Sequence, residues 1–238
     1  MSYYTNYLKK LKSACNKRKI SLVEVGQINN LPIYKVTLNP SASKIVVFSA
    51  GIHGDEIAGP WAIIDFLKQF NFQNYSGVKI ILFPVASPTA FDKKKRYNYL
   101  EKELNSLFCR KQLTNENRIL FSALKKEKVY FFHALHEDVD ENSFYLYNFE
   151  NKKEKIYRSI IKLAKDHFPI NNSAKIYKDS AIKGLIINRQ DGSFEDRMFR
   201  DGTPYSMCTE IPGKQLLKKR IILNVEIMNK IIDFTSHQ

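Results

Sequence analysis

One short segment constrains the fold more than any other: an apolar run that passes at once into a turn bracketed by glycines. Residues 44–50 (KIVVFSA) are typical of a buried strand, and the apolar residues of 57–70 recur at helical spacing. Between them, His53 and Glu56 lie in the turn Gly-Ile-His-Gly-Asp-Glu, at the carboxyl end of a strand, where open α/β sheets bind ligands. Both are good donors to Zn²⁺, although a turn histidine and a glutamate at a helix N-terminus would also explain them.

A second apolar strand supplies the next candidate ligand. Residues 129–135 are apolar and β-prone, and His136-Glu137-Asp138 ends the run abruptly. A catalytic zinc takes three protein ligands and keeps one position open, so we expect His136 to join His53 and Glu56. His133 competes for this role, but residues 133 and 136 point to opposite faces of a strand. We therefore expect His133 to be buried or to support a ligand.

Glu210 comes near the end of a third strand-like run, which Pro212-Gly213 stops. At such a strand end it is a candidate general base for the attacking water, although an isolated glutamate is more often an ordinary solvated residue. Cys208 shares a face with Glu210 in a strand. We expect Cys208 to pack at the pocket wall, because free cysteines are commonly buried, and we weigh a nucleophilic role second.

The order of these pieces resembles the zinc carboxypeptidase (funnelin) family, whose signature is HxxE, then a single His, then a catalytic Glu. Many members also carry the segment RxNxxGxDLNRxF, and residues 96–108 (RYNYLEKELNSLF) align with it without a gap. Two further stretches resemble a bacterial branch of the family: 136–138 with 144–147, and 191–194 leading to 209–212. The similarity covers roughly residues 30 to 235.

The resemblance implies a role for each matching residue. One Zn²⁺ ion per chain would be held by His53, Glu56 and His136. Arg96 would stabilise the oxyanion that forms when the scissile carbonyl becomes tetrahedral. Asn105 would help to hold the terminal carboxylate of the substrate. Glu210 would take a proton from water and pass it to the leaving amine.

The chain departs from the family segment at three positions, where Glu101, Glu103 and Ser106 replace Gly, Asp and Arg. The family's arginine clamps the C-terminal carboxylate in a bidentate way, and serine cannot supply that charge. Arg110, four residues on, would share a helical face with position 106 and is the expected substitute, and Lys111 is the alternative. The departure leaves exopeptidase specificity open and the hydrolytic core intact.

Two enzyme functions fit these residues. One is a carboxypeptidase-type hydrolase that cleaves an amide near a peptide C-terminus, for instance in a murein peptide. The other is a deacylase of N-acyl amino acids, similar to aspartoacylase and succinylglutamate desuccinylase. That branch more typically has Asn at the position of Asp55, which favours the peptidase, whereas the missing clamp arginine favours the deacylase.

The remaining pattern predicts an α/β fold: a single layered domain over residues 1–238 with a mixed, mostly parallel central sheet flanked by helices. With 238 residues and 44% apolar content, the chain can bury one sizeable core. The other expected strands are 22–28 and 33–38, forming a hairpin at one edge, and 78–85. The other expected helices are 119–126, 152–167 and 215–234.

The net charge of +14 raises a different class of function, a non-catalytic nucleic-acid-binding protein. The basic runs do not interleave aromatic residues as a stacking platform would, so we expect a solvated lysine-rich surface without specific nucleic-acid binding. Stoichiometric zinc would separate the two classes. Three cysteines without a CxxC pair fit a reducing compartment. No run of ~20 apolar residues could span a bilayer, and the N-terminus lacks the apolar core of a signal peptide, so we expect a cytoplasmic protein.

Overall fold

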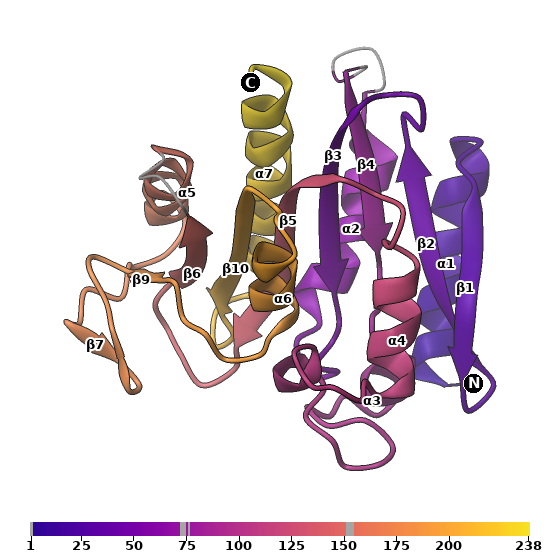
Figure 1. The fold of residues 1–238 in the computed structure, drawn as a ribbon, viewed down its shortest axis with the longest axis horizontal. Coiled ribbons are helices and arrows are strands. Elements are labelled where there is room, and N and C mark those ends of the chain that lie inside the picture. The colour runs from indigo at the N-terminus through magenta and orange to yellow at the C-terminus, as the bar shows by residue number, and fades with distance from the viewer. Residues whose placement is uncertain (1, 72–74, 76, 151–154) are drawn as a thin grey trace.

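The computed structural model describes residues 2–71, 75, 77–150 and 155–238. Across this part of the chain, an eight-stranded sheet runs in the order β1-β2-β4-β3-β5-β10-β6-β9 (Figure 1). Its strands are β1 (Leu22–Ile28), β2 (Leu31–Leu38), β3 (Lys44–Ala50), β4 (Val78–Phe83), β5 (Val129–Asp138), β6 (Tyr145–Glu150), β9 (Leu185–Ile187) and β10 (Tyr205–Pro212). A small hairpin, β7 (Lys175–Ile176) and β8 (Asp179–Ser180), lies outside it.

The sheet is mixed and mostly parallel, as predicted. β4, β3, β5 and β10 are parallel neighbours, as are β6 and β9, whereas β1–β2, β2–β4 and β10–β6 are antiparallel. The predicted edge hairpin is present. Asn29 and Asn30 form its two-residue turn with φ values of 48° and 61°, the left-handed conformation that such tight turns require.

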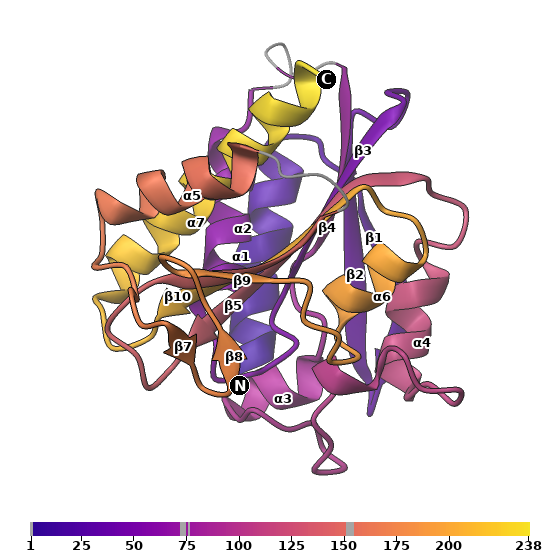
Figure 2. The same cartoon turned by 60° about the vertical axis from the view of Figure 1, so that its left-hand side comes forward.

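Helices cover both faces of the sheet (Figure 2). One face carries α1 (Tyr3–Lys17), α2 (Ala58–Gln69), α5 (Lys155–Lys165) and α7 (Leu217–Ser236), and the other carries α4 (Asn115–Ser122) and α6 (Phe194–Arg200). β3 shows why its sequence is continuously apolar: Val46 and Phe48 enter one core, while Ile45 and Val47 enter the other. A strand buried on both faces has no polar side to alternate with.

Several predicted bounds need correction. β5 does not end at His136 but continues to Asp138, because its ladder with β10 extends to the pair Asp138 and Pro212. The helix expected at 119–126 runs instead from Asn115 to Ser122, since the Thr114 hydroxyl caps it by accepting the Asn117 N–H.

The helix expected at 152–167 is seen as α5, while positions 152–154 of that prediction lie outside the described residues. The N-terminal helix α1 was not predicted, although Ser2 caps it by accepting from the Thr5 N–H. In the described ranges, no helix is long and apolar enough to cross a membrane.

Candidate metal centre and substrate cavity

His53 and Glu56 lie on the loop between β3 and α2, as the sequence predicts. Gly51 turns the chain with a φ of +64°, a conformation that side chains disfavour. A Cβ on Gly54 would lie 2.0 Å from the backbone of Ala90, in α3 (Pro88–Lys93), and the Gly54 N–H donates to the Lys95 carbonyl at 2.8 Å. The two glycines therefore let the loop press against α3, which fixes where His53 and Glu56 stand.

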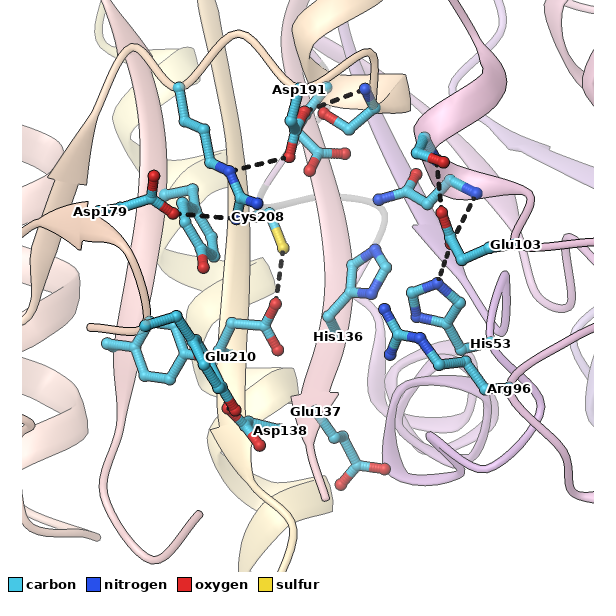
Figure 3. A pocket seen from close by; sticks show the side chains of 18 of the residues that line it. His53, Arg96, Glu103, His136, Glu137, Asp138, Asp179, Asp191, Cys208 and Glu210 are labelled. Carbon is cyan, nitrogen blue, oxygen red and sulfur yellow. Dashed lines mark hydrogen bonds and ion pairs between the residues drawn. The ribbon is translucent and has the colours of Figure 1, made fainter. Parts of the chain in front are cut away.

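His136 completes a buried group of three possible metal ligands. One ligand atom each from His53, Glu56 and His136 lies within 4.8 Å of the others, and each residue is at most 3% exposed. The Glu56 carboxylate stands between the imidazoles, with Oε1 2.5 Å from His53 Nδ1 and Oε2 2.8 Å from His136 Nδ1. Figure 3 shows the two rings side by side at the cavity wall.

This donor set fits zinc, because two imidazoles and a carboxylate are ordinary Zn²⁺ ligands and three of them leave one position open. The local charge also favours a cation. Burial lowers the pKa of His136, but Glu56 outweighs it and the net pKa is raised to about 10. The Glu56 carboxylate thus favours a positive charge at this position, as a metal site requires.

Glu103 orients His53 from outside this group. His53 Nε2 lies 2.7 Å from Glu103 Oε1, and the backbone N–H groups of Asn105 and Ser106 donate to the same carboxylate at 3.0 and 2.9 Å. A carboxylate behind a ligand histidine fixes the ring and leaves the other nitrogen to the metal. This role of Glu103 was not predicted from the sequence, although Glu103 keeps the carboxylate of the aspartate that it replaces in the family segment.

Glu137 is a second residue whose role the sequence did not reveal. Its side chain accepts the Ala58 N–H at 2.8 Å and pairs with Arg220, while its own N–H donates to Glu56 Oε2 at 3.2 Å. Glu137 therefore ties β5 to the start of α2 and to a candidate ligand. No spacing in the sequence predicts a contact between residues so far apart in the chain.

Glu210 lies on β10 directly opposite His136 on β5. Burial raises its pKa to about 8, and Glu56 and Asp138 add to the rise, while His136 opposes it. Cys208 shares the Glu210 face, as predicted, with Sγ 3.7 Å from Oε1 (Figure 3). Burial raises the pKa of this thiol well above its usual range, which keeps it protonated and unreactive.

His133 occupies the opposite face of β5, as its spacing from His136 predicts. It is fully buried, its Nε2 lies 2.8 Å from Thr209 Oγ1, and its ring packs on Phe48. Burial lowers its pKa to about 3, so the ring is neutral. His133 is a core residue of the sheet in this structure.

A cavity of about 890 Å³ opens beside the three candidate ligands. Arg96 lines it, with NH1 3.4 Å from Glu56 Oε1 and its side chain 46% exposed. Asn105 lines it too, and its Oδ1 accepts the Phe194 N–H at 3.2 Å, which orients the amide nitrogen as a donor. Both residues therefore line the cavity beside the candidate metal centre.

Arg110 is not brought to this cavity. The helical stretch at η1 (Asn105–Leu107) is one 3₁₀ turn only, so the expected shared face of positions 106 and 110 does not form. Arg110 instead lines a neighbouring cavity, which Ser106 also borders. Among the described residues, the guanidinium groups that line the first cavity belong to Arg96 and Arg189.

Arg189 is held in place by an ion-pair network. NH1 lies 3.2 Å from Asp179 Oδ2, Nε lies 3.5 Å from Asp191 Oδ2, and the guanidinium stands 5.2 Å from the centre of the Tyr147 ring.

A second cluster of possible ligand atoms, also within 4.8 Å of one another, is formed by His136, Cys208 and Glu210. It shares His136 with the first group, so the two groups compete for one histidine.

Comparison with known proteins finds a family and several solved structures that this chain resembles. Residues 42–142 match the family described as the succinylglutamate desuccinylase/aspartoacylase catalytic domain. A candidate metallopeptidase from Shewanella amazonensis has a TM-score of 0.90 and 27% identity, over 98% of this chain and 93% of that one. No curated protein matches the sequence.

More distant structures share the fold. A metallo-carboxypeptidase from Burkholderia cenocepacia has a TM-score of 0.72 at 15% identity, over 94% of this chain and 67% of its own. One from Pseudomonas aeruginosa, in complex with (2-guanidinoethylmercapto)succinic acid, has a TM-score of 0.73 at 13% identity, over 96% of this chain and 68% of its own. The resemblance to zinc carboxypeptidase-like proteins is thus confirmed at the level of the fold.

Proposed function

We propose that the protein is a zinc-dependent amide hydrolase of the metallocarboxypeptidase type, with one Zn²⁺ ion held by His53, Glu56 and His136. The observation that carries this proposal is the convergence of three buried donor atoms, within 4.8 Å of one another, beside a large cavity that Glu210 also lines. The similarity to the Shewanella amazonensis candidate metallopeptidase supports it.

When bound, the metal supplies the Lewis acidity that polarises the scissile carbonyl and activates a water molecule. Glu210 accepts a proton from that water molecule while the oxygen of the water bonds to the carbonyl carbon. The same carboxyl group then gives the proton to the departing nitrogen as the C–N bond breaks. Arg96, at the cavity wall, stabilises the oxyanion that develops on the carbonyl oxygen.

The substrate's terminal carboxylate needs a positive partner, because burying it unpaired is costly. Ser106 cannot provide one, and Arg110 lines a different cavity. Asn105 and Arg189 line the same cavity as the candidate metal centre, so they take this role. Asp179 and Asp191 hold the Arg189 fork in a fixed orientation, which lowers the entropy lost on binding.

The second candidate function is N-acyl amino acid deacylation, which the match of residues 42–142 to the desuccinylase/aspartoacylase family favours. Both functions hydrolyse an amide beside a carboxylate and use the same central residues. A murein peptide is one substrate of the first type. A panel of blocked C-terminal dipeptides, a murein tripeptide and N-acyl amino acids separates the two functions.

The test compares zinc-loaded protein, metal-stripped protein and the Glu210→Gln variant on that panel. We expect hydrolysis of at least one peptide by the zinc-loaded protein, little by the stripped protein, and recovery when zinc is returned. Hydrolysis that is indifferent to metal removal and to Glu210→Gln would contradict the proposal. Cleavage of N-acyl amino acids alone would select the deacylase.

A further inference from the structure

The cavity beside the candidate metal centre is acidic, although the chain as a whole is strongly basic. The protein has 38 Lys and Arg residues against 24 Asp and Glu. Among the described residues that line the cavity, nine carboxylate side chains stand against three cationic ones, Arg96, Lys178 and Arg189. A cleft lined mainly by one sign of charge concentrates ligands of the opposite sign.

Several of these carboxylates already have hydrogen-bond or ion-pair partners in the protein. Glu103 and Glu137 have the partners described above, and Arg189 pairs with both Asp179 and Asp191. Asp138 is bonded through Oδ2, which accepts from two tyrosine hydroxyls at 2.6 and 2.7 Å. These carboxylates form part of the cavity wall, and because they are already paired they do not need a cationic ligand.

Glu195 is different. It lies in the first turn of α6, lines the cavity and is only 3% exposed. Its Oε2 is buried and has no hydrogen-bond partner among the described residues. Burial raises the pKa of this carboxyl group, while the nearby His136 lowers it. A buried carboxylate oxygen without a partner is costly, and a cationic ligand at this wall would offset that cost.

We propose, on the basis of the hydrolase function above, that this cavity selects substrates whose leaving amino acid carries an ammonium group on its side chain, and that Glu195 binds that group. A hydrogen bond from Ser193 already reaches the Glu195 carboxylate, so one oxygen remains for the ligand. A compact ammonium suits one oxygen, whereas a guanidinium is bound best by two.

The same charges disfavour the acidic substrates after which the succinylglutamate desuccinylase/aspartoacylase family is named. Succinylglutamate and acylated aspartate carry several carboxylates, and the cavity would repel them at more points than Arg96, Lys178 and Arg189 could pair. The acidic wall therefore distinguishes this chain's substrate from those of the desuccinylase/aspartoacylase group.

The test uses three blocked peptides that differ only in the last residue: lysine, norleucine or glutamate. Norleucine keeps the lysine side chain's alkyl stem and lacks the ammonium group. For the zinc-loaded protein we expect kcat/KM to favour lysine over norleucine by roughly 10- to 100-fold, the usual worth of a hydrogen bond to a charged group, with glutamate poorest. Glu195→Gln should abolish that preference, because kcat/KM for the lysine peptide falls toward the value for the norleucine peptide.

Glu24→Gln is the matched control, because it removes the same charge from an exposed position on β1, away from the cavity. It should keep the lysine preference. A preference that survives Glu195→Gln, or a wild-type protein that cleaves the norleucine peptide as well as the lysine peptide, would overturn the inference while the hydrolase function stands.

If no peptide of the three is cleaved, the hydrolase function is in question, and the inference is still tested by binding. Calorimetry with free lysine and free norleucine on zinc-loaded protein makes the same comparison without turnover. Tighter binding of lysine that is lost in Glu195→Gln supports the ammonium site, and equal binding of the two amino acids overturns it.

Discussion

Glu210 and His136 are register partners on the adjacent parallel strands β10 and β5. The proposed base and a candidate metal ligand are thus spaced by the hydrogen-bond ladder of the central sheet, and not by a loop. Sites built on such rigid elements hold their geometry more closely than loop sites do. Metal binding and proton transfer can therefore be tested separately, because a substitution of Glu210 leaves the three candidate metal ligands in the chain.

Replacing Glu210 with glutamine tests this separation. Glutamine keeps the size of the side chain but cannot accept the proton of the water. Turnover should fall by ~10²–10⁴-fold, the usual contribution of a positioned general base. Steady-state kinetics and metal analysis of the purified variant measure the two properties. Zinc content should stay at one per chain, and near-native rates would remove Glu210 from the mechanism.

Single alanine variants of His53, Glu56 and His136 should each lose most of the bound zinc, because the proposed site holds the ion with these three protein ligands. Elemental analysis after dialysis against a weak chelator gives the zinc content per chain. His133→Ala is the control from the same strand. It should fold less stably, since His133 is fully buried, yet retain zinc. Loss of zinc from His133→Ala alone would mean that the ligand assignment is wrong.

Arg189→Ala and Arg110→Ala form a matched pair for the carboxylate clamp. Arg189→Ala should raise KM for substrates with a free terminal carboxylate, with a smaller effect on amidated analogues, since the amide carries no charge to pair. Arg110→Ala should leave both nearly unchanged, because Arg110 lines the neighbouring cavity. The reverse outcome would restore the clamp expected from the sequence. Arg96→Ala should depress turnover of both kinds of substrate.

Zinc affinity should rise with pH. In the metal-free protein the pKa of His136 is raised to about 10 from an ordinary value of 6.5, so the ring is protonated at neutral pH and zinc must displace that proton. Affinity should therefore gain up to about tenfold per pH unit for each proton displaced. Competition titrations over a range of pH measure this gain, and a pH-independent affinity would contradict it.

The same shift has a consequence for stability, whose sign follows from the raised pKa. The contribution of His136 to the stability of the metal-free fold is fully present below about pH 6.5 and is lost as pH rises through about 10. Bound zinc takes the place of that proton, so the stabilisation by zinc should grow over this window. Thermal unfolding with and without zinc compares the two states.

Much of this architecture could be predicted because its signals are local. The run at 44–50, the asparagine turn at Asn29-Asn30 and the face alternation of His133 and His136 each depend on neighbours in the chain. Strand and helix ends were less predictable. The Thr114 cap and the extension of β5 to Asp138 depend on a single side-chain bond and on pairing with β10.

The parts of the site that the sequence did not predict depend on contacts between distant residues. Glu103 contacts His53, which lies 50 residues away in the chain. Glu137, on β5, contacts the start of α2 at Ala58, which lies 79 residues away. The clamp candidate chosen from the sequence meets a related difficulty. Arg110 was chosen by sequence proximity to Ser106 and lines the neighbouring cavity, whereas Arg189 reaches the first cavity from another part of the fold. Spacing identifies candidate ligands, and only the folded chain shows what surrounds them.

The most direct test of the central claim is the position of the metal itself. Anomalous diffraction from zinc-loaded crystals, recorded above and below the zinc absorption edge, should show one peak per chain at about 2.0–2.2 Å from a nitrogen of His53, a nitrogen of His136 and an oxygen of Glu56. A peak held instead by His136, Cys208 and Glu210, or no peak in the cavity after zinc loading, would contradict the proposed catalytic centre.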